Sequence, residues 1–478
     1  MKEDLMNTTA LIIVLVYLAA MLAIGFWTNK KLIKTSADYM LAGRAVPMII
    51  VACSLAANNI GGGSTNGLVN RAFGSWGISA VWYVMAASIG LIPMIFFAPK
   101  LRGVMAFTIP EVVGRRFGKT AHITSAILNI VSLFCLTASQ ILTSGTILSL
   151  LIGLDLNFAI VLAAGFTILY TTMGGLWADS ITDLFQWIII FLGLLIALPF
   201  AVNAAGGWNN MMSSLPSEKL KPFGTLGFLG ILSLVINYFL TFTAGPEMVS
   251  RIFSAKDAKA SKNALIWAAV FMGVFSFVPT FIGLAGYAIN PNMPSNQVLA
   301  NVIFGHTPAW VAGAVSAAII ASTMSSADSD MLCASTIITK DLLPYFKSDL
   351  SDKSQIAISR AMNVIIGIGA MFIALFKIDI ITLNVFSFML RAAGPIAAFL
   401  LGLLWKNVGK AAGVISIFVG SAVGIGWQIL ANQMKVDNPY GFLPIVVGSA
   451  SSFITFIIVT YIERAMGRPP APELKIEE

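Results

Sequence analysis

About thirteen apolar segments, each long enough to cross a lipid bilayer, follow one another along this chain. Hydrocarbon offers the backbone no water, so a segment that crosses it must bond its own amides and carbonyls, normally as a helix. The approximate limits are 9–28, 47–69, 74–98, 121–151, 157–174, 184–204, 226–244, 263–288, 309–339, 356–376, 383–405, 411–431 and 441–463. This pattern predicts an all-α integral membrane protein that has the lipid bilayer as its solvent.

The composition supports the same class of protein. Of the 478 residues, 58% are hydrophobic and 10% are charged, and the mean hydropathy is +0.87. Soluble proteins carry about 25% charged residues. The net charge of +8 is explained by basic loops at a membrane surface and does not call for nucleic-acid binding. The three cysteines, Cys53, Cys135 and Cys333, lie in apolar segments without metal-binding spacing, so we expect free packing thiols.

Lysine and arginine are distributed unevenly between the two sides of this series of segments. Cytoplasmic loops are rich in both residues, so the richer side, which includes Lys30, Lys100, Arg251 and Lys340, is assigned to the cytoplasm. The segment at 9–28 is too long for a signal peptide and is expected to remain as a membrane helix. The odd number of spans then predicts a multi-pass protein of the cell (plasma) membrane with its N-terminus outside and its C-terminus in the cytoplasm.

The segment at 47–69 contains a stretch that disfavours a continuous helix. Gly61–Gly63 follow directly after Asn58, Asn59 and one isoleucine, and each glycine costs about 1 kcal/mol in a helix relative to alanine. A break at this depth is tolerated where the freed backbone lines a cavity or a bound ion, which predicts a discontinuous helix at a ligand site. The alternative is a stripe of small residues for close helix packing.

A second interruption ends the segment at 226–244. Gly245 and Pro246 disfavour a helix there, because proline lacks the amide donor and clashes with the preceding turn. If the segment at 9–28 is peripheral, the two interruptions fall in the first helix of each of two five-helix halves. Interrupted helices at corresponding positions are typical of inverted repeats that hold a substrate between them.

Four serines lie on one face of the segment at 309–339. Ser322, Ser325, Ser326 and Ser329 are spaced i, i+3, i+4 and i+7. Their hydroxyls, placed opposite the freed carbonyls of a broken helix, would form an oxygen-rich site for a hard cation such as sodium. The alternative is that each hydroxyl bonds back to a carbonyl of its own helix and holds no ligand.

Ionisable residues inside membrane segments point to function. Asp183 opens the segment at 184–204, where it would cap the helix or bind a cation. Asp328 and Asp330 lie deeper in their segment. Arg391 lies too far inside its segment for snorkelling to explain it. It would pair with a buried aspartate or receive a substrate carboxylate, and both interpretations stay open.

At this point the residues resemble the sodium:solute symporter family, which includes bacterial proline, pantothenate, sialic acid and sugar symporters. The resemblance covers nearly the whole chain and is most specific in Asp38–Arg44, Gly174–Gln186, Ala318–Leu342 and Leu404–Val414. It implies a leucine-transporter-type fold, in which two inverted five-helix repeats follow one extra helix and precede two more. The expected parts are a peripheral helix and loop (1–46), the first repeat (47–205), the second repeat (206–405) and two peripheral helices with a short tail (406–478).

The resemblance also implies a sodium site between the first and eighth core helices. Its ligands would be the carbonyls of Ala57, Ile60 and Ser322 and the hydroxyls of Ser325 and Ser326. Some members hold a second sodium ion, which here would use Asp183, Ser325, Asp328 and Ser329. Asp328 departs from the small or hydroxyl residue expected at its position, which leaves open the number of sodium ions and the participation of protons.

Substrate contacts in the family lie on the two broken helices and on the second, third and tenth core helices. Carried over to this chain, these contacts are Asn66, Trp82, Gln140, Asn237, Phe242 and Arg391. Trp82 and Phe242 are equally compatible with core packing.

The sequence thus predicts a sodium-coupled secondary symporter that imports a small organic solute by alternating access. Arg391 favours a carboxylate-bearing solute such as an amino acid or a monocarboxylate, with a sugar as the alternative. Sodium would be the coupling ion, and neither a cofactor nor an obligate protein partner is expected. The alternatives are a proton-coupled symporter and a transporter-like sensor, although the tail after residue 464 is short for a signalling domain. An enzyme is not expected, because no histidine clusters with cysteine or glutamate.

Overall fold

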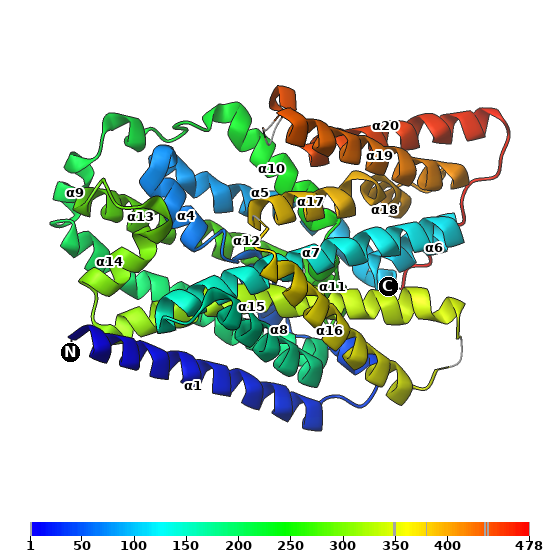
Figure 1. Ribbon diagram of the computed structural model, residues 1–478. Helices are drawn as coiled ribbons and strands as arrows, with labels where there is room; N and C mark the ends of the chain where they lie inside the picture. The colour runs from blue at the N-terminus through cyan, green and yellow to red at the C-terminus, as the bar shows by residue number, and fades with distance from the viewer. Residues whose placement is uncertain (1, 348–349, 379, 435, 437–438, 478) are drawn as a thin grey trace.

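The computed structural model describes residues 2–347, 350–378, 380–434, 436 and 439–477. In these residues the regular structure is helical, apart from one isolated β-bridge (Figure 1). The α-helices are α1 (Lys2–Lys31), α2 (Ser36–Leu41), α3 (Met48–Asn59), α4 (Asn66–Arg71), α5 (Val81–Gly103), α6 (Ile109–Phe117), α7 (Lys119–Ile152), α8 (Leu156–Ala204), α9 (Trp208–Ser214), α10 (Gly227–Thr243), α11 (Pro246–Ser254), α12 (Ala258–Phe275), α13 (Phe277–Ile289), α14 (Val298–His306), α15 (Ala309–Ile337), α16 (Asp352–Leu375), α17 (Ile380–Ala393), α18 (Pro395–Leu404), α19 (Lys410–Met434) and α20 (Pro444–Ala465).

The helices of the structure do not by themselves confirm the thirteen membrane spans that the sequence predicts. In the described residues, 9 helices are long and apolar enough to cross a membrane, or up to 11 if each of two bent pairs forms one span. The bent pairs are α10 with α11, at 58°, and α17 with α18, at 43°. The predicted thirteen are therefore not confirmed, because α8 joins the segments at 157–174 and 184–204, and α3 is too short to count by itself.

A glycine divides the long helix α8. Its 49 residues would measure about 73 Å as a straight helix, roughly two and a half times the thickness of the hydrocarbon core. Gly175 has φ 55° and ψ −160°, a conformation that is open almost only to glycine. A Cβ atom there would lie 2.4 Å from the carbonyl oxygen of Tyr39. The bend thus separates the two predicted segments and allows the short helix α2 to pack against α8.

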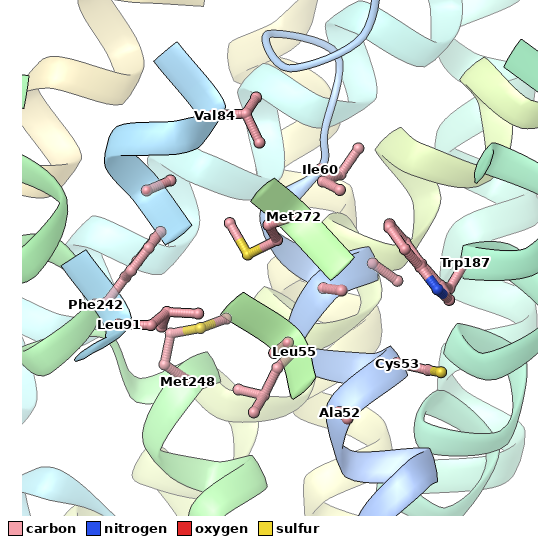
Figure 2. Packing of buried hydrophobic residues seen from close by; sticks show 14 of the residues in the cluster. Ala52, Cys53, Leu55, Ile60, Val84, Leu91, Trp187, Phe242, Met248 and Met272 are labelled. Carbon is pink, nitrogen blue, oxygen red and sulfur yellow. The ribbon is translucent and has the colours of Figure 1, made fainter. Parts of the chain in front are cut away.

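Helix α15 lies inside the bundle, in contact with α1, α7, α8 and α16 (Figure 1). Its side chains from Ala321 to Ile337 are all buried. Helix α3 packs against α8, α12 and α15. Figure 2 shows Leu55 of α3, together with Ile60, in one apolar cluster with Met272 of α12 and Trp187 of α8. Because other helices cover α15, it can carry polar residues that lipid contact would exclude.

The two interrupted segments are tied together at one end. The amide of Val46, which precedes α3, donates to the carbonyl of Ser254 over 3.1 Å. The amide of Lys256 donates back to Val46 over 3.1 Å, which completes the isolated bridge around Ala255. The beginning of α3 and the end of α11 therefore share backbone hydrogen bonds, although about two hundred residues separate them.

We expect the bend at Gly175 to require glycine. Gly175→Ala should lower the melting temperature of the detergent-purified protein, because a strained residue in this conformation costs about 1–3 kcal/mol and its Cβ would meet Tyr39. Gly165→Ala is the matched control in the same helix, since a Cβ there meets nothing within 4 Å. Equal melting temperatures for the two variants would contradict this role of Gly175.

Candidate cation and solute sites

The break after α3 frees backbone oxygens inside the bundle. The helix ends at Asn59, and Ile60 leaves it with φ −96° and ψ 69° while remaining fully buried. Farther along the break, a Cβ atom on Gly62 would lie 2.6 Å from the Thr143 side chain of α7. The lack of a side chain at Gly62 therefore allows the broken segment to lie against α7. The last carbonyls of α3 do not continue the regular backbone hydrogen bonds of a helix.

Helix α15 presents hydroxyls to these carbonyls. The Oγ of Ser325 donates to the carbonyl of Ala57 over 3.1 Å, and the Oγ of Ser326 donates to the carbonyl of Asn58 over 2.9 Å. Both hydroxyls also approach the carbonyl of Ser322, at 3.1 and 3.3 Å. Carbonyl and hydroxyl oxygens from two helices thus meet in one buried place. As ligands, these oxygens fit a hard monovalent cation.

The predicted ligands of this first site are placed as follows. Ala57, Ser322, Ser325 and Ser326 are brought together by these contacts, and Ile60 lies at the adjoining end of the helix. The hydroxyl of Ser322 donates to Ile319 of its own helix at 2.8 Å. It is therefore the carbonyl of Ser322, and not its side chain, that faces the other ligands.

The residues proposed for a second cation also lie together, beside the first site. One oxygen from each of Asp179, Asp183 and Asp328 lies within 4.8 Å of the others. Ser329 donates to Asp179 over 2.8 Å. Asp328 accepts the hydroxyl of Tyr170 and the amide of its neighbour Ser329. Sequence reasoning did not include Asp179, although it precedes Asp183 by one helical turn and shares its face.

A buried arginine lies in this cluster. The Arg251 side chain is fully buried and donates to Asp179 over 3.0 Å and to Asp183 over 2.9 Å. It also donates to the hydroxyl of Ser329. The assignment of Arg251 to a cytoplasmic loop is therefore wrong. The sequence placed it there because it follows a helix-breaking Gly-Pro and precedes several lysines, whereas α11 carries it back into the bundle.

A cavity of about 290 Å³ opens next to the first cation site. Both interrupted segments contribute to its wall, as do α7, α15, α17 and the beginning of α20. Its lining residues are Asn58, Asn59, Gly61, Gly63, Ser64, Arg71, Tyr83, Leu136, Gln140, Leu234, Asn237, Tyr238, Thr241, Phe242, Glu247, Ser326, Asp330, Asn384, Val385, Phe388, Arg391, Leu443 and Ile445. Ser326 and Asn58 therefore take part in both the oxygen cluster and the cavity.

Four of the six residues predicted to contact substrate line this cavity: Gln140, Asn237, Phe242 and Arg391. The other two lie outside its lining. Trp82 donates its indole N–H to the carbonyl of Pro222 over 2.9 Å and stacks on Phe223. Asn66 begins the helix α4 beyond the break.

Charged side chains on the cavity wall are only partly paired. Both carboxylate oxygens of Glu247 accept from Arg391 over 2.7 Å. The partner of Arg391 is thus a glutamate from α11 and not an aspartate, and the sequence did not single out this glutamate because it follows Gly-Pro like a capping residue. Asp330 is only 3% exposed, lines the same cavity and bonds with no side chain that the structure describes.

The chain is similar to known transport proteins over most of its length. The model of the sodium:solute symporter family matches residues 39–420. The chain is 28% identical over 491 residues to the sodium/proline symporter of Staphylococcus aureus strain JH9, with 97% of this chain and 94% of that protein covered. Proteins from other strains of that species match equally well.

Solved structures show the fold. A sodium-coupled sialic acid symporter in a substrate-bound outward-open state superposes with a TM-score of 0.84 at 22% identity, covering 98% of this chain and 99% of that one. The nucleobase-cation-symport-1 family transporter Mhp1, closed around a hydantoin, gives a TM-score of 0.61 at 15% identity, covering 91% and 97%. The fold is therefore the all-helical membrane fold of the leucine-transporter type.

We expect the pair of Arg391 and Glu247 to matter for stability. Glu247→Ala should lower the melting temperature in detergent, because the loss of one partner from a buried pair costs about 3–5 kcal/mol. The double variant Arg391→Met/Glu247→Leu should regain most of the loss, since it leaves no unpaired charge. Unchanged melting in Glu247→Ala would contradict a buried pair.

Proposed function

This chain belongs to the sodium:solute symporter family, and from that membership we propose that it imports a small organic solute by alternating access, driven by sodium. Its relatives are transporters and not enzymes, which agrees with a binding role for the cavity. Sodium would be the coupling ion, with the cell membrane as its location, the N-terminus outside and the C-terminus in the cytoplasm.

One observation carries this proposal: the oxygen cluster and the cavity share a wall. Ser326 donates to the carbonyl of Asn58, and both residues line the cavity. A sodium ion held by Ala57, Ile60, Ser322, Ser325 and Ser326 would fix the end of α3 against α15 and so shape the cavity for the solute. A solute that favours this arrangement would in turn strengthen sodium binding, because linkage between two sites is reciprocal.

The interrupted helices support alternating access. Segments broken at mid-membrane allow one half of a transporter to rotate relative to the other around a central site. In this chain α10 and α11 bend by 58° at Gly245, and α11 carries the cavity residue Glu247. The cavity reaches Leu443 and Ile445, at the end of α20 that the predicted topology places outside. Under that topology, this end of the cavity would face the outside of the cell.

The charges on the cavity wall favour a zwitterionic solute. Arg391 would receive a carboxylate, which is one of the two roles that the sequence leaves open, although it must share its charge with Glu247. Asp330 makes no hydrogen bond with a described side chain and would receive an ammonium group. Among carboxylate-bearing solutes, an amino acid thus fits better than a monocarboxylate, because a monocarboxylate would leave Asp330 unmatched in a buried site. A sugar would bring no positive charge to Asp330.

Sodium binding is tested by thermal stability in sodium against potassium at equal ionic strength. Sodium alone should raise the melting temperature, since a ligand at about 100 times its Kd stabilises by about 2.7 kcal/mol. Ser326→Ala should lose this sodium-specific increase. Ser322→Ala is the matched control and should keep it, because its hydroxyl bonds to Ile319 of its own helix.

If sodium and potassium act alike on the wild type, sodium coupling is contradicted. A proton-coupled symporter would then be the next candidate, with Asp328 as its proton carrier, because Asp328 is buried and bonded to Tyr170.

The charge of the solute is tested by uptake into proteoliposomes in sodium. L-proline and other zwitterionic amino acids should be taken up in preference to propionate and glucose. Asp330→Asn should weaken amino-acid binding by about 10- to 100-fold, as expected for a lost hydrogen bond to a charged group. Asp155→Asn, which alters a helix cap outside the cavity, should leave it unchanged. Equal uptake of propionate and amino acids would contradict the role of Asp330.

A further inference from the structure

Arg251 connects four parts of the bundle through one buried side chain. It lies on α11, the second half of an interrupted helix, and its Nε donates to Ser54 of α3 over 2.7 Å. Its terminal nitrogen NH2 donates to Asp179 and Asp183 of α8 and to Ser329 of α15. NH1 donates to the Glu247 carbonyl of its own helix over 2.9 Å. These contacts use four of the five donors of the guanidinium group.

The oxygens that Arg251 contacts overlap with those expected for a second sodium ion. Of that expected set, Asp183 and Ser329 accept directly from the guanidinium group. Ser325 is turned toward Ala57 in the first site, and Asp328 bonds with Tyr170 and with the amide of Ser329. A sodium ion here would have to share Asp183 and Ser329 with a fixed positive charge, and repulsion between the two cations disfavours a second ion.

One oxygen of the cluster remains without a hydrogen bond. It is Oδ1 of Asp183, which has no partner among the residues that the structure describes. A hard cation takes about six oxygen ligands, so this single atom cannot replace the oxygens bound to Arg251. Displacing Arg251 instead would leave its charge unpaired inside the bundle, which is far more costly than exchanging one ion for another.

We propose that Arg251 is a tethered cation that takes the place of a second sodium ion, so that a single sodium ion binds to each protein molecule. The guanidinium group stays protonated throughout the cycle, and its positive charge is attached to α11. It places one positive charge on the carboxylates of α8, as a bound sodium ion would, yet it is not released to either side. This inference rests on the proposed sodium coupling and specifies its stoichiometry.

A tethered charge has a consequence for the driving force. Each sodium ion that enters with the solute adds its share of the ion gradient and of the membrane potential. A carrier with one bound sodium ion therefore accumulates its solute less steeply than a carrier with two. Arg251 would keep one positive charge beside the cluster of aspartates in every state, which allows this carrier to work with fewer ions.

The stoichiometry is measured first on the wild type. Equilibrium binding of radioactive sodium to the purified protein should saturate at one ion per molecule, and the sodium-dependent rise in melting temperature should follow a single-site curve. Ser326→Ala should abolish both. Saturation at two ions, or a sodium-specific rise that survives in Ser326→Ala, would overturn the inference.

The second measurement asks whether loss of Arg251 opens a cation site. Arg251→Met keeps the length of the side chain and removes its charge, so three aspartates remain without an internal cation. The double variant Arg251→Met/Ser326→Ala should therefore regain a sodium-specific rise in melting temperature that Ser326→Ala lacks. Arg102→Met/Ser326→Ala is the matched control and should regain nothing, because Arg102 bonds to the carbonyl of Ala255, away from the cluster.

The outcomes separate this inference from the proposed function. If the wild type shows no sodium-specific binding, sodium coupling itself fails. If the wild type binds one ion but the folded double variant shows no response to sodium, coupling stands and the tethered-cation role of Arg251 is contradicted. If the double variant does not fold, the number of ions bound to the wild type still decides the matter.

Discussion

The contact between the end of α3 and the polar face of α15 is the interaction on which the rest of this structure depends. A helix can stop inside a membrane only if its freed carbonyls find donors or a cation there. Here Ser325 and Ser326 supply the donors, and α15 can carry them because α1, α7, α8 and α16 cover it. The outer helices therefore shield a polar centre from lipid, and the break in α3 becomes a binding element.

The buried charges follow from the same constraint. Each charge within the bundle needs a partner, and the two arginines find theirs across different elements: Arg251 with Asp179 and Asp183, and Arg391 with Glu247. Both pairs include a residue of α11, the second half of an interrupted helix. A movement of α11 would strain both pairs at once, so the helix that borders the cavity is also the one that holds the charge network together. Asp330, which forms no ion pair with a described side chain, lines the cavity.

Much of the first cation site could be predicted from the sequence. Because the serines of α15 have helical spacing, periodicity alone predicts that they share one face of the helix. Ser325 and Ser326 do contact the end of α3. The charge network could not be predicted in this way. Arg251 lies near the lysines of a loop, and Glu247 follows Gly-Pro like a helix cap, so local patterns favour the surface for both. Their burial depends on where α11 lies in the bundle, and no local sequence pattern predicts that position.

By itself, the sequence determined that this chain is an all-helical membrane protein with two interrupted helices and an oxygen-rich stripe, because hydropathy and helix-breaking residues act locally. Only the tertiary structure decided that α8 continues through its bend at Gly175, that Arg391 pairs with Glu247 and that Arg251 lies on the aspartates. Those outcomes depend on contacts between segments far apart in the chain. These partners meet only when the helices pack and each buried charge has to be paired. The sequence of a single segment does not show which distant residue will be its partner.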